Sequence, residues 1–107
     1  MTETNKIVSL DSEVDKYFLA EVFNEACSLE DDFTYCHGIN MMAHSFVNTD
    51  NIESVIMKNK NLFYYSIKLF CSGNISDGKY NDRALEFLER FNITYNKVTS
   101  KQEFFNS

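Results

Sequence analysis

The residues best suited to chemistry in this chain are three cysteines and two histidines. Cys27, Cys36, His37 and His44 are ligand types that zinc prefers. On a helix, however, His37 and His44 would lie two turns, or about 10.5 Å, apart. One zinc ion needs both ring nitrogens within about 2 Å, and helical ligand pairs are normally four residues apart. The spacing therefore predicts no metal site, and no motif indicates a cofactor.

The two histidines belong to a polar stripe that a helix over 33–47 would carry. His37, Asn40, His44 and Asn48 follow one another along the margin of its apolar sector. Such a stripe could hydrogen-bond a partner or a ligand, and its charge would change between about pH 6 and 7. The simpler alternative is a solvated helix edge. The sequence leaves both interpretations open.

Signatures of catalysis are missing from the chain. It has no phosphate-binding glycine loop, no nucleophile elbow, and no EF-hand pattern around Gly78. The acidic residues fall on faces predicted to be solvated, whereas acid–base catalysis needs a desolvated carboxylate. We therefore predict a protein that is not an enzyme. The alternative is a small redox or other enzyme that uses Cys71 or the His37/His44 stripe.

Cysteine use and apolar runs bear on location. An odd number of cysteines at wide spacing is typical of buried thiols in a reducing cytosol. The first residues lack the basic-then-apolar order of a signal peptide. The longest apolar run, 61–72, is too short to cross a bilayer and contains Lys68. We expect a cytoplasmic protein that does not contact membranes.

Charge is distributed unevenly along the 107 residues, which carry a formal net charge of −6. Residues 1–32 contain nine acidic and two basic side chains, whereas 33–107 contain seven acidic and eight basic ones. A negative field repels nucleic acid and suits a basic protein surface. The candidate partner-binding acids are Glu21, Glu25, Asp31 and Asp32. Solubility alone would also explain such a charge.

Hydrophobic spacing predicts the elements that would position these residues. We expect helices over about 13–29, 33–47, 51–58 and 80–91. The apolar sector of the second helix would consist of Phe33, Cys36, Ile39, Ala43, Phe46 and Val47. Segment 61–72 fits a strand or a helix, and we favour the helix because Gly73 follows it as a left-handed cap. Residues 73–79 are predicted to be a loop, and 93–98 a short strand or extended turn.

The fold class that follows is mainly α. We expect a small bundle of four to five short helices in a single domain, residues 1–107, with a minor β element and a loose N-terminal tail at 1–8. The alternative is an α+β fold with strands near 63–71 and 93–98. No second domain fits in a chain of this length.

One stretch of the chain resembles a known family. The segment IKLFCSGN, followed by DRALEFLERF and NITYNKV, resembles the strand–helix–strand opening of glutaredoxins. The resemblance would place Cys71 in the nucleophile region of that family and would favour a strand over 64–71. The C-x-x-C motif and the cis-proline of the family are absent, so the resemblance does not imply redox activity.

Aromatic residues near the C-terminus offer a further surface. Phe104 and Phe105 would either dock on the domain or form a patch that binds a partner or a second copy. The abundance of Asn, Lys, Ile, Phe and Tyr, the residues of AT-rich codons, favours a phage, a virus, a mobile element or an AT-rich bacterium over a GC-rich source. Our leading hypothesis is an acidic cytosolic protein-interaction module, such as a phage- or virus-encoded inhibitor of a host protein. The alternative to a partner protein is self-association as a homodimer or structural protein.

Overall fold

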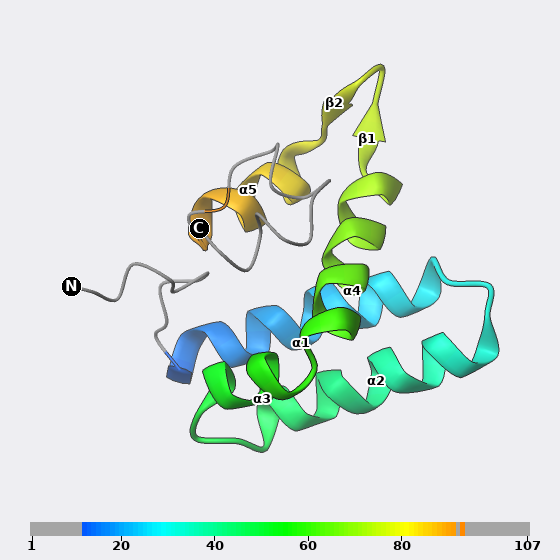
Figure 1. Ribbon diagram of the computed structural model, residues 1–107. Helices are drawn as coiled ribbons and strands as arrows, with labels where there is room; N and C mark the ends of the chain where they lie inside the picture. Colours follow the sequence, from blue (N-terminus) through cyan, green and yellow to red (C-terminus); the bar gives the residue numbers. More distant parts are fainter. Residues whose placement is uncertain (1–11, 92, 94–107) are drawn as a thin grey trace.

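Five helices and a two-stranded hairpin build the part of the chain that the computed structural model describes, residues 12–91 and 93 (Figure 1). The expected mainly α fold with a minor β element is confirmed. Within these residues, no helix has both the length and the apolar character needed to span a bilayer. The elements are α1 (Ser12–Ser28), α2 (Phe33–Val47), α3 (Ile52–Lys58), α4 (Lys60–Gly73), β1 (Ile75–Ser76), β2 (Lys79–Tyr80) and α5 (Asp82–Arg90).

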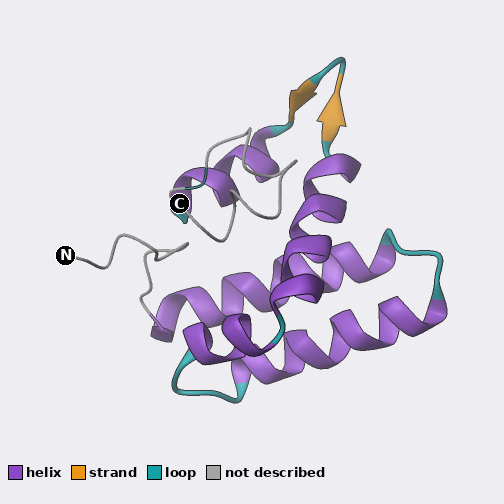
Figure 2. Cartoon of the chain, in the orientation of Figure 1, coloured by secondary structure: helices purple, strands orange, loops and turns teal. Residues whose placement is uncertain are grey.

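Helices α1 and α2 form an antiparallel pair, and α4 crosses one face of that pair (Figure 1, Figure 2). The inner face of α1 buries Val22, Phe23 and Ala26 at helical spacing. The ring of Phe23 meets that of Phe46 on α2 edge-on, with 5.2 Å between centroids, and lies 5.4 Å from that of Phe63 on α4. These aromatic contacts join three helices in one core.

The ambiguous segment 61–72 is helical. The buried side chains of α4 repeat every three or four residues along one helix face: Phe63, Ser66, Ile67, Phe70 and Cys71. A strand would have placed the buried Phe70 on the same side as the exposed Lys68. The α+β alternative with a strand near 63–71 is therefore wrong, as is the strand favoured by the glutaredoxin resemblance. Residues 94–98 of the other expected strand lie outside the described residues.

Gly73 serves packing rather than a left-handed turn. The residue that caps the C-terminus of α4 is Asn74, with a φ of −109°. Among the described residues, positive φ values occur only at Asp77 and Gly78. A Cβ atom at Gly73 would overlap the side chain of Leu29, which follows α1. The expected left-handed cap is therefore wrong, and the missing side chain instead lets the loop after α1 rest against α4.

A β-hairpin occupies the stretch that was expected to be a loop. The φ angles of Asp77 and Gly78 are 53° and 81°. A two-residue type I′ turn requires such left-handed values at both central positions. The strands pair antiparallel, with Ile75 opposite Tyr80. The Asp-Gly dipeptide is the sequence signal for this turn. The prediction of a loop over 73–79 did not take this signal into account.

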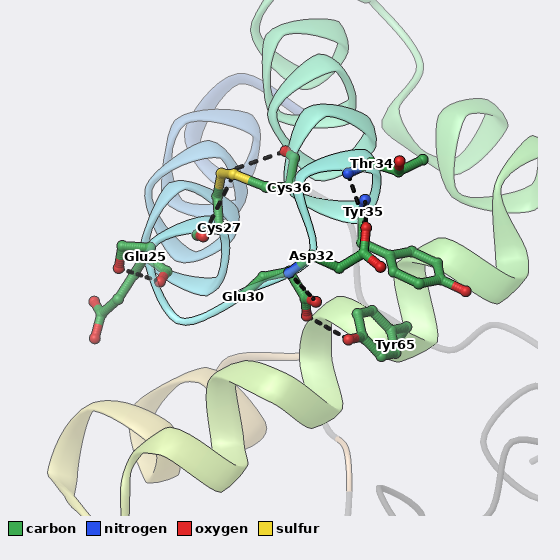
Figure 3. The surroundings of a disulfide bond; sticks show 9 residues. Glu25, Cys27, Glu30, Asp32, Thr34, Tyr35, Cys36 and Tyr65 are labelled. Atoms are coloured by element: carbon green, nitrogen blue, oxygen red, sulfur yellow. Dashed lines mark hydrogen bonds between the residues drawn. A yellow bond between two sulfur atoms is a disulfide. The ribbon is translucent and has the colours of Figure 1, made fainter.

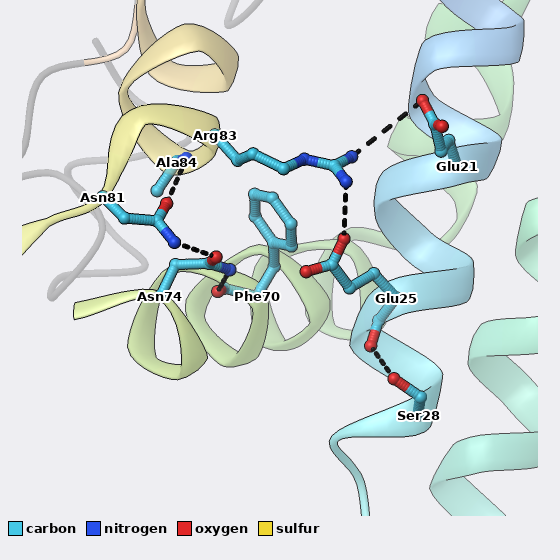
Figure 4. Close-up of polar contacts among 8 residues, drawn as sticks. All are labelled: Glu21, Glu25, Ser28, Phe70, Asn74, Asn81, Arg83 and Ala84. Carbon is cyan, nitrogen blue, oxygen red and sulfur yellow. Dashed lines mark hydrogen bonds and ion pairs between the residues drawn. The ribbon is translucent and has the colours of Figure 1, made fainter. Parts of the chain in front are cut away.

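Helix α5 begins at Asp82, later than expected, because Asn81 caps it. The Asn81 side chain accepts the N–H of Ala84 at 3.1 Å and donates to the side-chain oxygen of Asn74 (Figure 4). Asn74 is buried, and its amide group donates to the carbonyl oxygen of Phe70 at 2.7 Å. This series of hydrogen bonds ties the start of α5 to the end of α4.

A second aromatic cluster fixes α5 on the other helices. The ring of Phe87 lies 6.0 Å from Phe18 of α1, 5.9 Å from Phe70 of α4, and 5.1 Å from Phe91, measured between centroids. Phe87 is fully buried. Its contacts hold α5 beside α1, which positions the charged residues of both helices opposite one another.

Candidate functional site

The α1–α2 hairpin ends in a short loop with three consecutive acidic residues. We name residues 29–37, which comprise this loop and the first turn of α2, the acidic tip (Figure 3). The carboxylate of Asp32 accepts the N–H of Thr34 at 2.9 Å and that of Tyr35 at 3.4 Å. An aspartate at this position satisfies free N–H groups and complements the helix dipole. The local sequence therefore favours the start of α2 at Phe33.

A disulfide lies at the base of the acidic tip. It joins Cys27, near the end of α1, to Cys36 in the first turn of α2, with 5.0 Å between their Cα atoms. The expectation of buried free thiols is therefore wrong for this pair, and both residues are half-buried. Sequence reasoning missed the pairing because it depends on the antiparallel packing of two helices, which brings the two Cβ atoms together.

Tyr65 of α4 holds the loop of the acidic tip. Its phenol donates a hydrogen bond to one carboxylate oxygen of Glu30, whose other oxygen accepts the N–H of Asp32 at 3.0 Å. The ring of Tyr35 lies on that of Tyr65, with 5.1 Å between centroids. The bond to Glu30, then burial, then nearby negative charge raise the pKa of Tyr65 to about 12. Tyr65 thus stays a protonated donor at neutral pH, and Glu30 is engaged within the protein.

Phe33 projects from the acidic tip into solvent. Its exposed fraction is 84%, the largest among the big apolar side chains of the described residues. The expected apolar sector of α2 is wrong at this position. At about 100° per residue, Phe33 falls on the His37 side of the helix, away from the buried Ile39. Asp31 and Asp32 precede it and are exposed, so a solvated aromatic ring stands next to two carboxylates.

The structure places Glu21 and Glu25 opposite α5. Nitrogen atoms of the Arg83 guanidinium lie 4.0 Å from the carboxylate of Glu21 and 3.2 Å from that of Glu25 (Figure 4). In the same contact, Nε of Arg90 lies 2.9 Å from the buried carboxylate of Asp15. We name the set formed by Asp15, Glu21, Glu25, Arg83 and Arg90 the α1–α5 seam. Both arginines of the chain belong to it, so two of the predicted partner-binding acids face a basic residue of their own chain.

His37 and His44 are both exposed but occupy different places on α2. His37 belongs to the acidic tip. His44 lines a hollow of about 160 Å³ between α1 and α2, together with Ala20, Asn24, Ala43 and Val47. The amide group of Asn48 donates to the carbonyl oxygen of His44 at 2.9 Å, so part of the predicted polar stripe serves to end the helix. The described residues contain no group of three or more side chains arranged to hold a metal ion.

Cys71 has the surroundings of a core residue. Its side chain is 1% exposed, and burial raises the pKa of its thiol to about 12. A nucleophilic cysteine is instead an accessible thiolate in an electropositive setting. Nothing around Cys71 therefore favours the redox role considered for it. Two other candidates, Phe104 and Phe105, lie outside the described residues, as does the tail at 1–8.

Charge along the chain on either side of the acidic tip is of one sign. No lysine or arginine occurs between Lys16 and Lys58, a stretch that contains seven acidic residues. The absence of lysine and arginine over 17–57 is visible in the sequence. The exposure of Phe33 and the contact of Tyr65 with the tip are not. The chain matches no protein-family model, and comparison with curated proteins and with solved structures finds no similar protein.

Proposed function

We propose that this protein is a small protein-interaction module whose acidic tip binds a basic surface on a partner protein. The observation that carries the proposal is the 84% exposure of Phe33 next to Asp31 and Asp32, in a stretch without lysine or arginine. The partner surface that fits would offer an apolar pocket for the ring, bordered by lysine or arginine side chains.

The two parts of this surface would contribute differently to binding. Burial of an exposed phenylalanine ring is worth about 2–3 kcal/mol, because apolar area leaves water. The exposed carboxylates of Asp31 and Asp32 would attract the basic partner, which raises the association rate and makes it sensitive to salt. A second copy of this chain fits less well, because two acidic tips would repel each other.

The composition of the chain bears on the organism from which it comes. We propose a phage- or virus-encoded modulator of a host protein that acts in the cytosol; the abundance of residues with AT-rich codons supports only the source. A host protein with a basic surface is a suitable target, because a positive field that attracts phosphates also attracts exposed carboxylates. The acidic tip would then act by occlusion rather than by catalysis.

A capture experiment with matched variants tests the proposal. The tip variant carries Asp31→Asn, Asp32→Asn and Phe33→Ala, and asparagine at 32 keeps the side-chain oxygen that caps α2. The control variant carries Asp50→Asn and Met57→Ala, which also remove one exposed acid and one exposed apolar side chain. Proteins captured from cells of the natural source are identified by mass spectrometry, and the affinity of each is measured at two salt concentrations.

We expect the native chain and the control variant to capture the same basic protein. The tip variant should bind it at least tenfold more weakly and with less dependence on salt. If the tip variant retains both the affinity and the salt dependence of the native chain, the proposal is wrong. Sedimentation of the native chain alone distinguishes self-association, which would appear as a dimer that the Phe33→Ala substitution dissociates.

A further inference from the structure

The Cys27–Cys36 disulfide lies where the acidic tip joins its two helices (Figure 3). Residues 28–35, which include Asp31, Asp32 and Phe33, form the loop that this bond closes. Both cysteines are half-buried rather than enclosed in the core, and exchange requires that a thiolate reaches one of their sulfur atoms. The bond is thus placed to restrain the exposed residues of the tip at the margin of the core.

The surroundings of the two sulfur atoms suit the reduced state as well. Sγ of Cys27 lies 3.3 Å from the carbonyl oxygen of Cys36, and Sγ of Cys36 lies 3.6 Å from the carbonyl oxygen of Cys27. After reduction, each thiol would therefore have an acceptor for its S–H group already in place. The core contact between Phe23 and Phe46 does not involve either sulfur, so the helix pair can persist without the bond.

We propose that Cys27 and Cys36 form a reversible redox site whose reductant is a dithiol or glutathione. A thiolate of the reductant attacks one sulfur, a mixed disulfide forms, and the other cysteine leaves as a thiolate. A second reductant thiolate then attacks the reductant sulfur of the mixed disulfide and releases the remaining cysteine. Two electrons pass to the protein, two protons end on its thiols, and the reductant becomes a disulfide.

Reduction would loosen the acidic tip without unfolding the molecule. The bond between Glu30 and Tyr65 and the cap at Asp32 still hold the loop, but the covalent restraint on the ends of α1 and α2 is lost. A looser tip must be ordered again when it binds, which weakens affinity. This consequence rests on the proposed function, whereas the redox chemistry of the pair does not.

Thiol counting tests the redox site. The protein is equilibrated with mixtures of reduced and oxidised glutathione, alkylated while folded, and weighed by mass spectrometry. We expect two modified cysteines after reduction and none after oxidation, with full reversal, because the buried Cys71 does not react in the folded state. A Cys71→Ala variant should give the same result. Two modified cysteines in every mixture, or a bond that the mixtures cannot reduce, would overturn the proposal.

Hydrogen exchange and melting test the effect on the tip. Reduction should speed amide exchange in residues 29–37 at least tenfold and lower the melting temperature by about 10 °C, with circular dichroism showing retained helix. The Cys27→Ser, Cys36→Ser variant should match the reduced protein. Unchanged exchange in 29–37 would contradict the inference. The capture experiment, repeated with the tip substitutions in the Cys27→Ser, Cys36→Ser background, shows separately whether the tip binds a partner.

Discussion

The acidic tip and the α1–α5 seam contain the same kind of side chains but use them in opposite ways. In the seam, each acid meets an arginine, and the carboxylate of Asp15 that pairs with Arg90 is buried. In the tip, Asp31 and Asp32 face solvent without a basic neighbour in the surrounding sequence. The seam therefore serves the fold, whereas the charge of the tip is what we propose attracts a basic partner.

The aromatic residues of the two regions show the same contrast. Phe87 beside the seam is fully buried among other rings, whereas Phe33 in the tip is 84% exposed. A protein of this size buries little apolar surface, so each large apolar side chain left out of the core lowers the stability that it could have had. Phe33, on a cross-linked and hydrogen-bonded turn, stays in solvent and adds nothing to that core, and binding is the role that we propose for it.

The largest expected effect compares these two phenylalanines. Phe87→Ala should lower the free energy of unfolding by about 3–5 kcal/mol, because a buried ring is lost and a cavity remains. Phe33→Ala should change it by less than about 0.5 kcal/mol. Urea unfolding followed by circular dichroism measures both. If Phe87→Ala does not fold, Phe87→Leu should keep the same order with a smaller loss. Equal losses at 33 and 87 would show that the tip is part of the core.

A smaller effect distinguishes the ion pair of the buried Asp15 from the two ion pairs of Arg83. Arg90→Met should cost about 2–3 kcal/mol, because it leaves the buried carboxylate of Asp15 without its guanidinium. Arg83→Met should cost less than about 1 kcal/mol, because its pairs with Glu21 and Glu25 are partly exposed and screened by salt. Thermal unfolding at low and high salt measures both. A larger loss for Arg83→Met would reverse this assignment.

The smallest effect concerns Tyr65, which anchors the tip to α4. Its pKa in the folded state is raised to about 12 from the ordinary value of 10.0, so the stabilisation it gives is complete below pH 10 and is lost as the pH rises to 12. Tyr65→Phe should cost about 1 kcal/mol at neutral pH. It should also remove part of the fall in unfolding free energy between pH 10 and 12. Parallel pH profiles for native and variant chains would contradict this role.

Much of the fold could be predicted from residue spacing. The second helix has the bounds that its apolar positions and the cap at Asp32 indicate, and the third and fourth helices differ by about a residue. The errors in the fold prediction arose where the conformation or packing of a residue depends on a contact with a residue far away in the sequence. Gly73 was assigned a turn conformation, although the reason for a glycine there is Leu29, which no local pattern reveals.

The candidate site was less predictable than the fold. Asp31, Asp32 and His37 were identified from charge and residue type, and the structure gathers them in the acidic tip. Glu21 and Glu25 were identified on the same grounds, and the structure turns them toward Arg83. The difference lies in the packing of α5, which is set by the burial of Phe87 rather than by any charge.

The sequence by itself determined most of the helices, the cap at Asp32 and the long stretch without lysine or arginine, because each of these depends on neighbours within a few positions. Only the tertiary structure decided which acids are paired, that Cys27 meets Cys36, and that Phe33 is left in solvent. Those outcomes depend on how helices that are far apart along the chain pack on one another. Packing is governed by the burial of the two aromatic clusters. The positions of the charged side chains, the thiols and the exposed rings follow from that packing.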